Sequence, residues 1–174
     1  TLAKILFTSG STSTPKGVPQ THRMLCVNQA QYLACWPFLG KQAPIILDWM
    51  PWNHVFGGNS DFNMALSNGG TLYLDHGKPT ETLFGLTIEN LRLVKPTISA
   101  NVPIAYAMLV KALERDPSLR KRFFERLDLI FYAGASLPDD IWNSLEKMAL
   151  AQRGFVPMMT SSWGMTETAP MALI

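Results

Sequence analysis

The segment Leu129-Ile-Phe-Tyr132 is a short apolar run, followed by Ala133-Gly-Ala135 and then by an amphipathic stretch over residues 139–152. A brief buried run, small loop residues and a helix-period stretch are typical of a strand–loop–helix unit. Gly154 lies just beyond the stretch, where a helix commonly ends. The segment therefore favours a parallel sheet, whose strands are joined through helices.

The same alternation of short apolar runs and longer amphipathic stretches continues along the chain. Thr21 is expected to cap the first helix. Strands of about five residues separated by helices indicate βαβ units. The sequence thus predicts an α/β fold, with a mostly parallel sheet and helices on both faces. The other expected strands are residues 5–7, 45–50, 71–75, 97–100 and 156–160, and the other expected helices are 22–34, 57–66, 80–94, 104–114 and 119–127.

The composition narrows the class of protein. The 174 residues are 47% hydrophobic and 16% charged, which fits a globular domain and disfavours disorder. A net charge of +2 from scattered basic residues is too weak a field to favour nucleic acid or an anionic membrane as partner. No apolar run approaches the roughly 20 residues of a spanning helix. Cys26 and Cys35 form no disulfide framework, so a reduced, cytoplasmic setting is expected.

The loop after the first expected strand, Thr8-Ser-Gly-Ser-Thr-Ser-Thr-Pro-Lys-Gly17, is rich in hydroxyl groups. In open parallel sheets, ligands bind beyond the carboxyl ends of strands, and hydroxyl and N–H donors beside a lysine suit a phosphate chain. The loop is not a Walker A motif, because Pro15 stands where the second glycine is needed. The alternative is a flexible Ser/Thr linker. The candidate phosphate-binding residues are Thr8, Ser9, Gly10, Ser11, Thr12, Ser13, Thr14 and Lys16.

Together with three later motifs, this loop resembles the AMP-forming acyl-CoA synthetases and their adenylating relatives. The later motifs are Pro51-Trp-Asn-His-Val-Phe-Gly57, Ala133-Gly-Ala-Ser-Leu-Pro138 and Trp163-Gly-Met-Thr-Glu167. Four ordered motifs over nearly the whole chain are far more specific than any one of them. Within the family, Pro51-Trp-Asn-His-Val-Phe-Gly-Gly-Asn59 is most similar to the feruloyl-CoA synthetase branch.

The resemblance implies a two-step ligase, in which a carboxylate attacks the α-phosphate of ATP and a thiol, usually coenzyme A, then displaces AMP. It places Lys16 and the hydroxyl-rich loop at the departing pyrophosphate, Thr166 at the α-phosphate and Glu167 at Mg²⁺. One carboxylate with waters and phosphate oxygens suits Mg²⁺. The alternative for Thr166 and Glu167 is a helix-capping pair.

For the adenine, the resemblance implies contact with Gly134, Ala135 and Ser136 on one side and stacking of Trp163 on the other, with Gly164 and Met165 also at the nucleotide. The family commonly carries Tyr in place of Trp163, so a hydrogen bond from that position is in doubt. The family also usually has Gly in place of Ser13. We therefore expect this chain to bind or use the nucleotide more weakly or more slowly, without losing that function.

For the acyl group, the resemblance implies that His54 borders the bond between carboxyl and phosphate. The resemblance also places Phe56 near the acyl group, and an aromatic, hydroxycinnamate-like acid would suit ring stacking against that side of the pocket. The alternative for His54 is a hydrogen-bonded structural histidine. The candidate acyl-pocket residues are His54, Phe56, Gly57, Asn101 and Val102.

The leading hypothesis is therefore an ATP-dependent carboxylate–CoA ligase that uses ATP, Mg²⁺ and CoA. Residues 1–174 would be the central part of its large N-terminal domain, without the C-terminal lid domain, because both ends look cut from a longer chain. The family's ribose-binding aspartate, hinge and C-terminal lysine lie downstream, so these residues alone are expected to be inactive. Alternatives are a non-catalytic nucleotide-binding or scaffold module and a serine hydrolase, although the chain has no G-x-S-x-G elbow.

Overall fold

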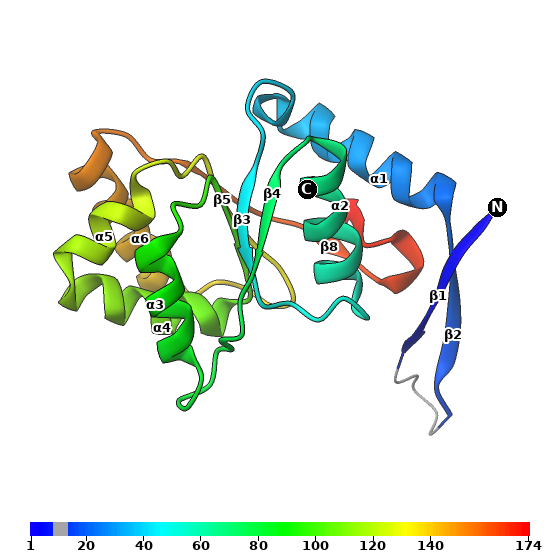
Figure 1. The fold of residues 1–174 in the computed structure, drawn as a ribbon, viewed down its shortest axis with the longest axis horizontal. Coiled ribbons are helices and arrows are strands. Elements are labelled where there is room, and N and C mark those ends of the chain that lie inside the picture. Colours follow the sequence, from blue (N-terminus) through cyan, green and yellow to red (C-terminus); the bar gives the residue numbers. More distant parts are fainter. Residues whose placement is uncertain (9–13) are drawn as a thin grey trace. The chain divides into compact units, whose positions relative to one another are not determined.

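The computed structural model describes residues 1–8 and 14–174, and the chain divides into two compact units. The first unit comprises Thr1–Pro44, Met50–Thr71 and Ser162–Ile174, and the second comprises Ile45–Trp49 and Leu72–Ser161. Figure 1 shows both and labels most of their helices and strands. In the described part of the chain, no helix combines the length and the apolar character that crossing a membrane requires.

The second unit is built on a five-stranded sheet with the order β4-β3-β5-β6-β7. The pairs β3–β5, β5–β6 and β6–β7 are parallel, and Leu129 lies between Ile98 and Met158. This arrangement confirms the predicted α/β fold. The strands are β3 (Ile45–Asp48), β4 (Thr71–Leu74), β5 (Ile98–Asn101), β6 (Leu129–Tyr132) and β7 (Met158–Ser161).

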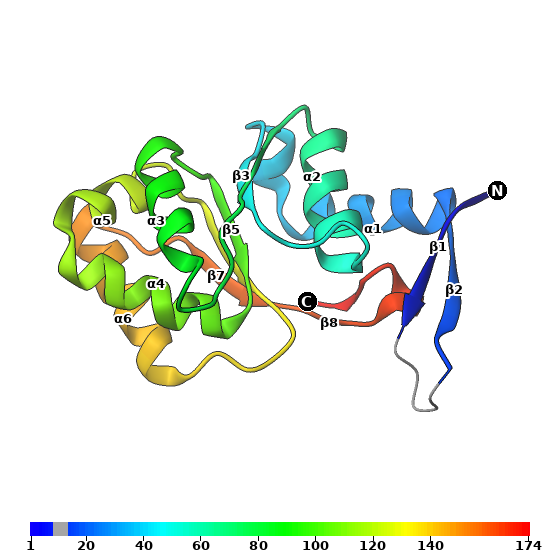
Figure 2. The ribbon, with the colours of Figure 1, turned by 60° about the horizontal axis from the view of Figure 1, so that its bottom comes forward.

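Four helices of the second unit, grouped beside this sheet in both ribbon views (Figures 1 and 2), share one hydrophobic core. Tyr106 ties this core to the sheet, since its hydroxyl lies 2.7 Å from the Ser99 carbonyl oxygen and 3.0 Å from that of Phe131. Gly154, at φ 75°, ends the last helix as predicted. The helices are α3 (Phe84–Leu93), α4 (Pro103–Arg115), α5 (Pro117–Phe124) and α6 (Asp139–Arg153).

The first unit begins with an antiparallel hairpin of β1 (Leu2–Thr8) and β2 (Lys16–Thr21). This corrects the expectation that the first strand belongs to the parallel sheet, and β2 was missed altogether. Gly17 and Pro19 disfavour strand formation in the sequence. Pro19 is tolerated because this hairpin has only two strands, so one edge of β2 needs no ladder partner. Lys16 therefore opens a strand and does not end a loop.

Helices and short turns complete the first unit. Thr21 caps α1 (His22–Cys35) as predicted, because its Oγ1 accepts a hydrogen bond of 3.2 Å from the Met24 amide. The predicted helix at 57–66 is a π-helical turn, η2 (Phe56–Asp61), followed by the short α2 (Phe62–Ser67). The turns η1 (Pro37–Gly40) and η3 (Thr166–Thr168) and the strand pair β8 (Trp163–Gly164) and β9 (Met171–Leu173) were not predicted.

Candidate functional site

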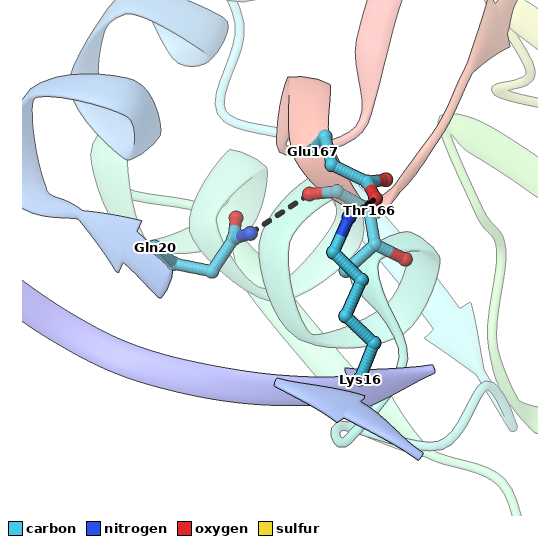
Figure 3. A network of polar contacts seen from close by, with 4 residues as sticks. All are labelled: Lys16, Gln20, Thr166 and Glu167. Carbon is cyan, nitrogen blue, oxygen red and sulfur yellow. Dashed lines mark hydrogen bonds and ion pairs between the residues drawn. The ribbon is translucent and has the colours of Figure 1, made fainter. Parts of the chain in front are cut away.

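An ion pair joins two predicted site residues that are 151 positions apart in the sequence. Lys16 Nζ, at the start of β2, lies 3.2 Å from Glu167 Oε1 in η3 (Figure 3). The Lys16 side chain is 65% exposed and that of Glu167 43%. A pair so exposed contributes little to stability. Both groups are accessible to a ligand.

The carboxyl of Glu167 is held in its charged form. A hydrogen bond from its own backbone amide lowers the pKa of Glu167 below the ordinary value of 4.5, and the Lys16 ammonium lowers it further. At neutral pH the side chain is therefore a carboxylate. An ionised, exposed carboxylate is the form that can bind a cation.

One pocket of the first unit collects three further predicted residues. Thr8 comes from the end of β1, His54 from the turn before η2 and Thr166 from η3, and together they line a pocket of about 400 Å³. Thr166 precedes the ion-paired Glu167 in the chain. The hairpin, the histidine motif and the Thr-Glu motif thus meet at one place, and their contacts with a ligand stay predictions. The other lining residues are Leu6, Phe7, Asn53 and Val55.

His54 is oriented by the helical turn that follows it. Its Nδ1 accepts a hydrogen bond of 3.2 Å from the Phe56 amide, and its carbonyl accepts one of 2.9 Å from the Gly58 amide. Because Nδ1 accepts, the neutral ring carries its proton on Nε2, and that nitrogen can donate. The two readings of His54 are therefore compatible, since the side chain is anchored and also lines the pocket.

Phe56 and Gly57 are buried within η2, and their predicted contact with an acyl group stays a prediction. Gly57 has a packing reason to be glycine. A Cβ at this position would lie 2.7 Å from the Met50 Cβ and carbonyl oxygen, which is too close for any side chain.

The second unit has its own pocket, of about 450 Å³, beside the loop that follows β6. Gly134, Ala135 and Ser136 line it, and so does Val102 at the start of α4. Gly134 has φ +91°, a conformation that glycine adopts without strain. The sequence assigned Val102 to the acyl group and the other three to adenine, whereas the structure places all four around one cavity. The other lining residues are Pro103, Ile104, Ala107 and Pro138.

Asn101, the last residue of β5, is tied to a tryptophan that sequence reasoning assigned no role. Trp49 Nε1 donates a hydrogen bond of 2.7 Å to Asn101 Oδ1. This bond joins the carboxyl ends of β3 and β5 inside the second unit. A structural role for Asn101 is therefore visible, and its contact with an acyl group stays a prediction.

Some predicted contacts remain predictions. Trp163, Gly164 and Met165 belong to the first unit and Gly134 to the second, so stacking of both sides on one adenine is untested. Trp163 is 57% exposed, and its indole is open to a partner. The predicted phosphate-binding residues Ser9, Gly10, Ser11, Thr12 and Ser13 lie outside the described residues. Thr14 is exposed at the start of the described part of the hairpin.

Metal binding was assigned to Glu167 alone. Among residues 1–8 and 14–174, no three His, Cys, Asp or Glu side chains gather into a cation cage. Mg²⁺ commonly takes one or two carboxylates and completes its shell with waters and substrate phosphates. An exposed carboxylate beside the pocket that Thr166 lines fits that mode of binding.

Sequence reasoning missed three buried side-chain amides, those of Gln20, Asn28 and Asn59, which donate hydrogen bonds to backbone oxygens of residues 166–171. Gln20 Nε2 donates a hydrogen bond of 2.8 Å to the Thr166 carbonyl oxygen. No local pattern marks such residues, because the three are spread over 40 positions and only the fold brings them together. A polar residue buried in a strand is the one sign, and the strand of Gln20 was not predicted.

Comparison with known proteins places these observations in a family. Residues 1–174 match the family described as AMP-binding enzyme. The crotonobetaine/carnitine–CoA ligase of Escherichia fergusonii is 30% identical over 166 residues, which cover 95% of this chain and 29% of that protein. The chain therefore spans less than a third of that relative's length.

Solved structures share the fold. A malonyl-CoA ligase in a ternary product complex with methylmalonyl-CoA and AMP matches 96% of this chain and 33% of its own, with a TM-score of 0.73 and 24% identity. The McyG A-PCP structure complexed with phenylalanyl-adenylate matches 98% of this chain and 30% of its own, with a TM-score of 0.77 and 22% identity. With the family match over its whole length, the chain belongs to the AMP-binding enzyme family.

Proposed function

We propose that this chain carries the phosphate- and nucleotide-binding residues of an ATP-dependent, AMP-forming acid–thiol ligase, as the central part of the N-terminal domain of a longer protein. The observation that carries the proposal is the pocket of the first unit. Thr8, His54 and Thr166 line it, and the Lys16–Glu167 ion pair lies at the same turn as Thr166.

In the first step, a carboxylate oxygen of the acid attacks the α-phosphorus of ATP. The bond from that phosphorus to the bridging oxygen breaks, and pyrophosphate leaves with the electron pair. In the second step, the CoA sulfur attacks the carbonyl carbon, AMP leaves, and the thiol proton is released. Phosphoryl chemistry of this kind depends mainly on positioning and charge neutralisation.

The residues of the site have matching roles. The Lys16 ammonium neutralises the charge of the departing pyrophosphate, and the Thr8 and Thr166 hydroxyls donate to phosphate oxygens. His54 Nε2 donates toward the developing bond between carboxyl and phosphate. Glu167 would hold Mg²⁺, which would neutralise part of the phosphate charge.

The ion pair gives each of the two charged side chains a partner when no ligand is bound. Lys16 and Glu167 neutralise each other at 3.2 Å. A phosphate chain offers Lys16 a more highly charged partner, and a divalent cation does the same for Glu167. Lys16 and Glu167 would therefore exchange one weak surface pair for two stronger interactions when a metal–nucleotide complex is bound.

We further propose an aromatic, hydroxycinnamate-like acid as substrate, CoA as the acceptor and a cytoplasmic setting. The first rests on the motif of residues 51–59, which resembles feruloyl-CoA synthetases. The relative named above is a ligase for crotonobetaine and carnitine, so those acids are the direct competitors. Cys26 and Cys35 are unpaired, which supports a reducing compartment.

The test is acid-dependent exchange of labelled pyrophosphate into ATP by the full-length protein. The panel contains a hydroxycinnamate, a fatty acid, crotonobetaine and carnitine. Exchange with the hydroxycinnamate supports the adenylation step and the aromatic substrate class, whereas exchange with another acid alone corrects the substrate class. ATP binding without exchange for any acid would contradict the ligase and favour a non-catalytic nucleotide-binding module.

A further inference from the structure

The backbone of residues 166–171 in the first unit is held by three buried side-chain amides. Gln20 in β2, Asn28 in α1 and Asn59 in η2 are 0%, 2% and 1% exposed. We call these three side chains the amide network. Each comes from a different element, so the turn that carries Thr166 and Glu167 is bonded to three separate parts of the unit.

Gln20 uses both ends of its amide. Its Nε2 donates to the Thr166 carbonyl oxygen over 2.8 Å (Figure 3), and its Oε1 accepts from Asn59 Nδ2 over 3.0 Å. Asn59 lies in η2, and His54 lies in the turn that comes directly before η2. One side chain thus joins the strand that begins with Lys16, the turn that carries His54 and the carbonyl of Thr166.

The other two amides hold the far end of the same segment. Asn28 Nδ2 donates to the Met171 carbonyl oxygen over 3.0 Å and to that of Thr168 over 3.3 Å. Asn59 Nδ2 also lies 3.4 Å from the Ala169 carbonyl oxygen. The segment is therefore fixed on both sides of Glu167, whose own side chain stays exposed.

We propose that Gln20 is a positioning residue that sets the Thr166 hydroxyl and the Glu167 carboxylate relative to Lys16 and His54. The inference rests on the proposed function. A buried amide that bonds two groups leaves both of them desolvated and unpaired when it is removed. Misplacement of reacting groups by about 1 Å can reduce a rate roughly 100-fold, so a residue that touches no substrate can still control the chemical step.

The test compares Gln20→Leu with Gln29→Leu in the full-length protein. Gln29 is a matched control, because its Nε2 donates to the Asn59 backbone oxygen over 3.0 Å and it has no described bond to residues 166–171. We expect Gln20→Leu to lower kcat of ATP–pyrophosphate exchange roughly 10–100-fold with KM for the acid unchanged. Gln29→Leu should stay within about twofold. Equal kcat values for the two variants would overturn the proposal.

Hydrogen exchange of the amides of residues 163–171 gives a second readout, which needs no activity. We expect Gln20→Leu to speed this exchange roughly 2–10-fold over Gln29→Leu, as the loss of one hydrogen bond implies. Equal hydrogen-exchange rates of these amides in the two variants would overturn the positioning role. A wild type inactive with every acid would overturn the proposed function instead, and hydrogen exchange would then decide on Gln20.

If Gln20→Leu fails to fold, Gln20→Asn takes its place in both measurements. Asparagine keeps the amide but is one methylene shorter, so it cannot reach Thr166 and Asn59 together. The same split between kcat and KM is expected, and its absence counts equally against the proposal.

Discussion

The pocket lined by Thr166 and the pocket lined by Gly134 are built by different physical means. The pocket of the first unit has Thr8, His54 and Thr166 in its wall, and buried amides and an ion pair hold the turn that carries Thr166. The pocket of the second unit is lined by Gly134, Ala135 and apolar residues at the start of α4. Its wall follows β6 directly and adjoins the hydrophobic core.

The difference separates two kinds of contact with a ligand. Charged and hydroxyl groups that converge from distant segments suit phosphate and carboxylate, which need donors at set positions. A small-residue, apolar wall suits a flat ring, because the absence of large side chains lets the backbone come close. Substitutions in either pocket should therefore change activity, and substitution of Gly134 in the second should also change stability, because of its left-handed backbone.

The largest effect is expected from Glu167→Gln, at the residue next to Thr166 of the first pocket. Loss of the carboxylate should reduce ATP–pyrophosphate exchange by about 10²–10³-fold, the range found when one electrostatic group of an active site is removed. The melting temperature should hardly change, because the Lys16–Glu167 pair is exposed. Steady-state kinetics and thermal unfolding measure the two.

Glu146→Gln, at an exposed position of α6, is the matched control. It should leave both the exchange rate and the melting temperature as they are. Full activity in Glu167→Gln would remove the charge-based account of the first pocket.

In the second pocket, Gly134→Ala should lower the free energy of unfolding by about 1–2 kcal/mol, because a Cβ disfavours the observed φ of +91°. The added methyl would meet only Val102 Cγ1, at 3.9 Å, so steric collision is not the cause. Denaturant unfolding of the variant and the wild type measures this difference in the free energy of unfolding.

Gly85→Ala serves as the comparison, since Gly85 lies in α3 with no atom near its Cβ position. It should stabilise by about 0.5–1 kcal/mol. A stabilising Gly134→Ala would show that the loop does not need its left-handed turn.

A smaller loss is expected for Thr21→Ala, at the junction of β2 and α1. Its Oγ1 accepts the Met24 amide, and removal of such a cap lowers stability by about 1 kcal/mol. Thr21→Ser keeps the oxygen and should be close to wild type in the same unfolding experiment. If both variants lose stability equally, the methyl group is what matters and not the cap.

The smallest effect concerns pH. The pKa of Glu167 is lowered by its backbone hydrogen bond and by Lys16, so the stability it contributes is present above the unfolded-state pKa. That contribution is lost only as pH falls through the lower folded-state pKa. NMR titration of the Glu167 carboxyl should give a midpoint below 4.5, and Lys16→Met should raise it. A midpoint at or above 4.5 in the wild type would exclude the ion pair in solution.

The second unit was largely predictable from sequence. Its elements follow from local patterns: the buried runs of β5 and β6, the amphipathic α6 and the helix end at Gly154. Each pattern is set by neighbouring residues, so it can be recognised without knowing the tertiary structure. The first unit was harder to predict, because Gly17 and Pro19 are residues that disfavour a strand and β2 contains both. The polar residues of η2, Asn59 among them, are buried through tertiary contacts that no periodicity records.

The same contrast holds for the site. Lys16, His54, Thr166 and Glu167 were predicted as site residues because they belong to motifs that resemble those of a known family and have a chemical reason for each residue type. Gln20, which bonds to the Thr166 carbonyl, was not found, since a single glutamine carries no pattern. Side chains that hold a site in place depend on distances across the fold, and a sequence does not display them.

The central claim is that the pocket of Thr8, His54 and Thr166 receives the phosphates of ATP. The most direct measurement is a crystal structure of the full-length protein with Mg²⁺ and a non-hydrolysable ATP analogue. We predict phosphate oxygens in this pocket, with Lys16 Nζ moved from Glu167 to a phosphate and Glu167 on the metal. A nucleotide bound elsewhere, with the Lys16–Glu167 distance still at 3.2 Å, would contradict the account.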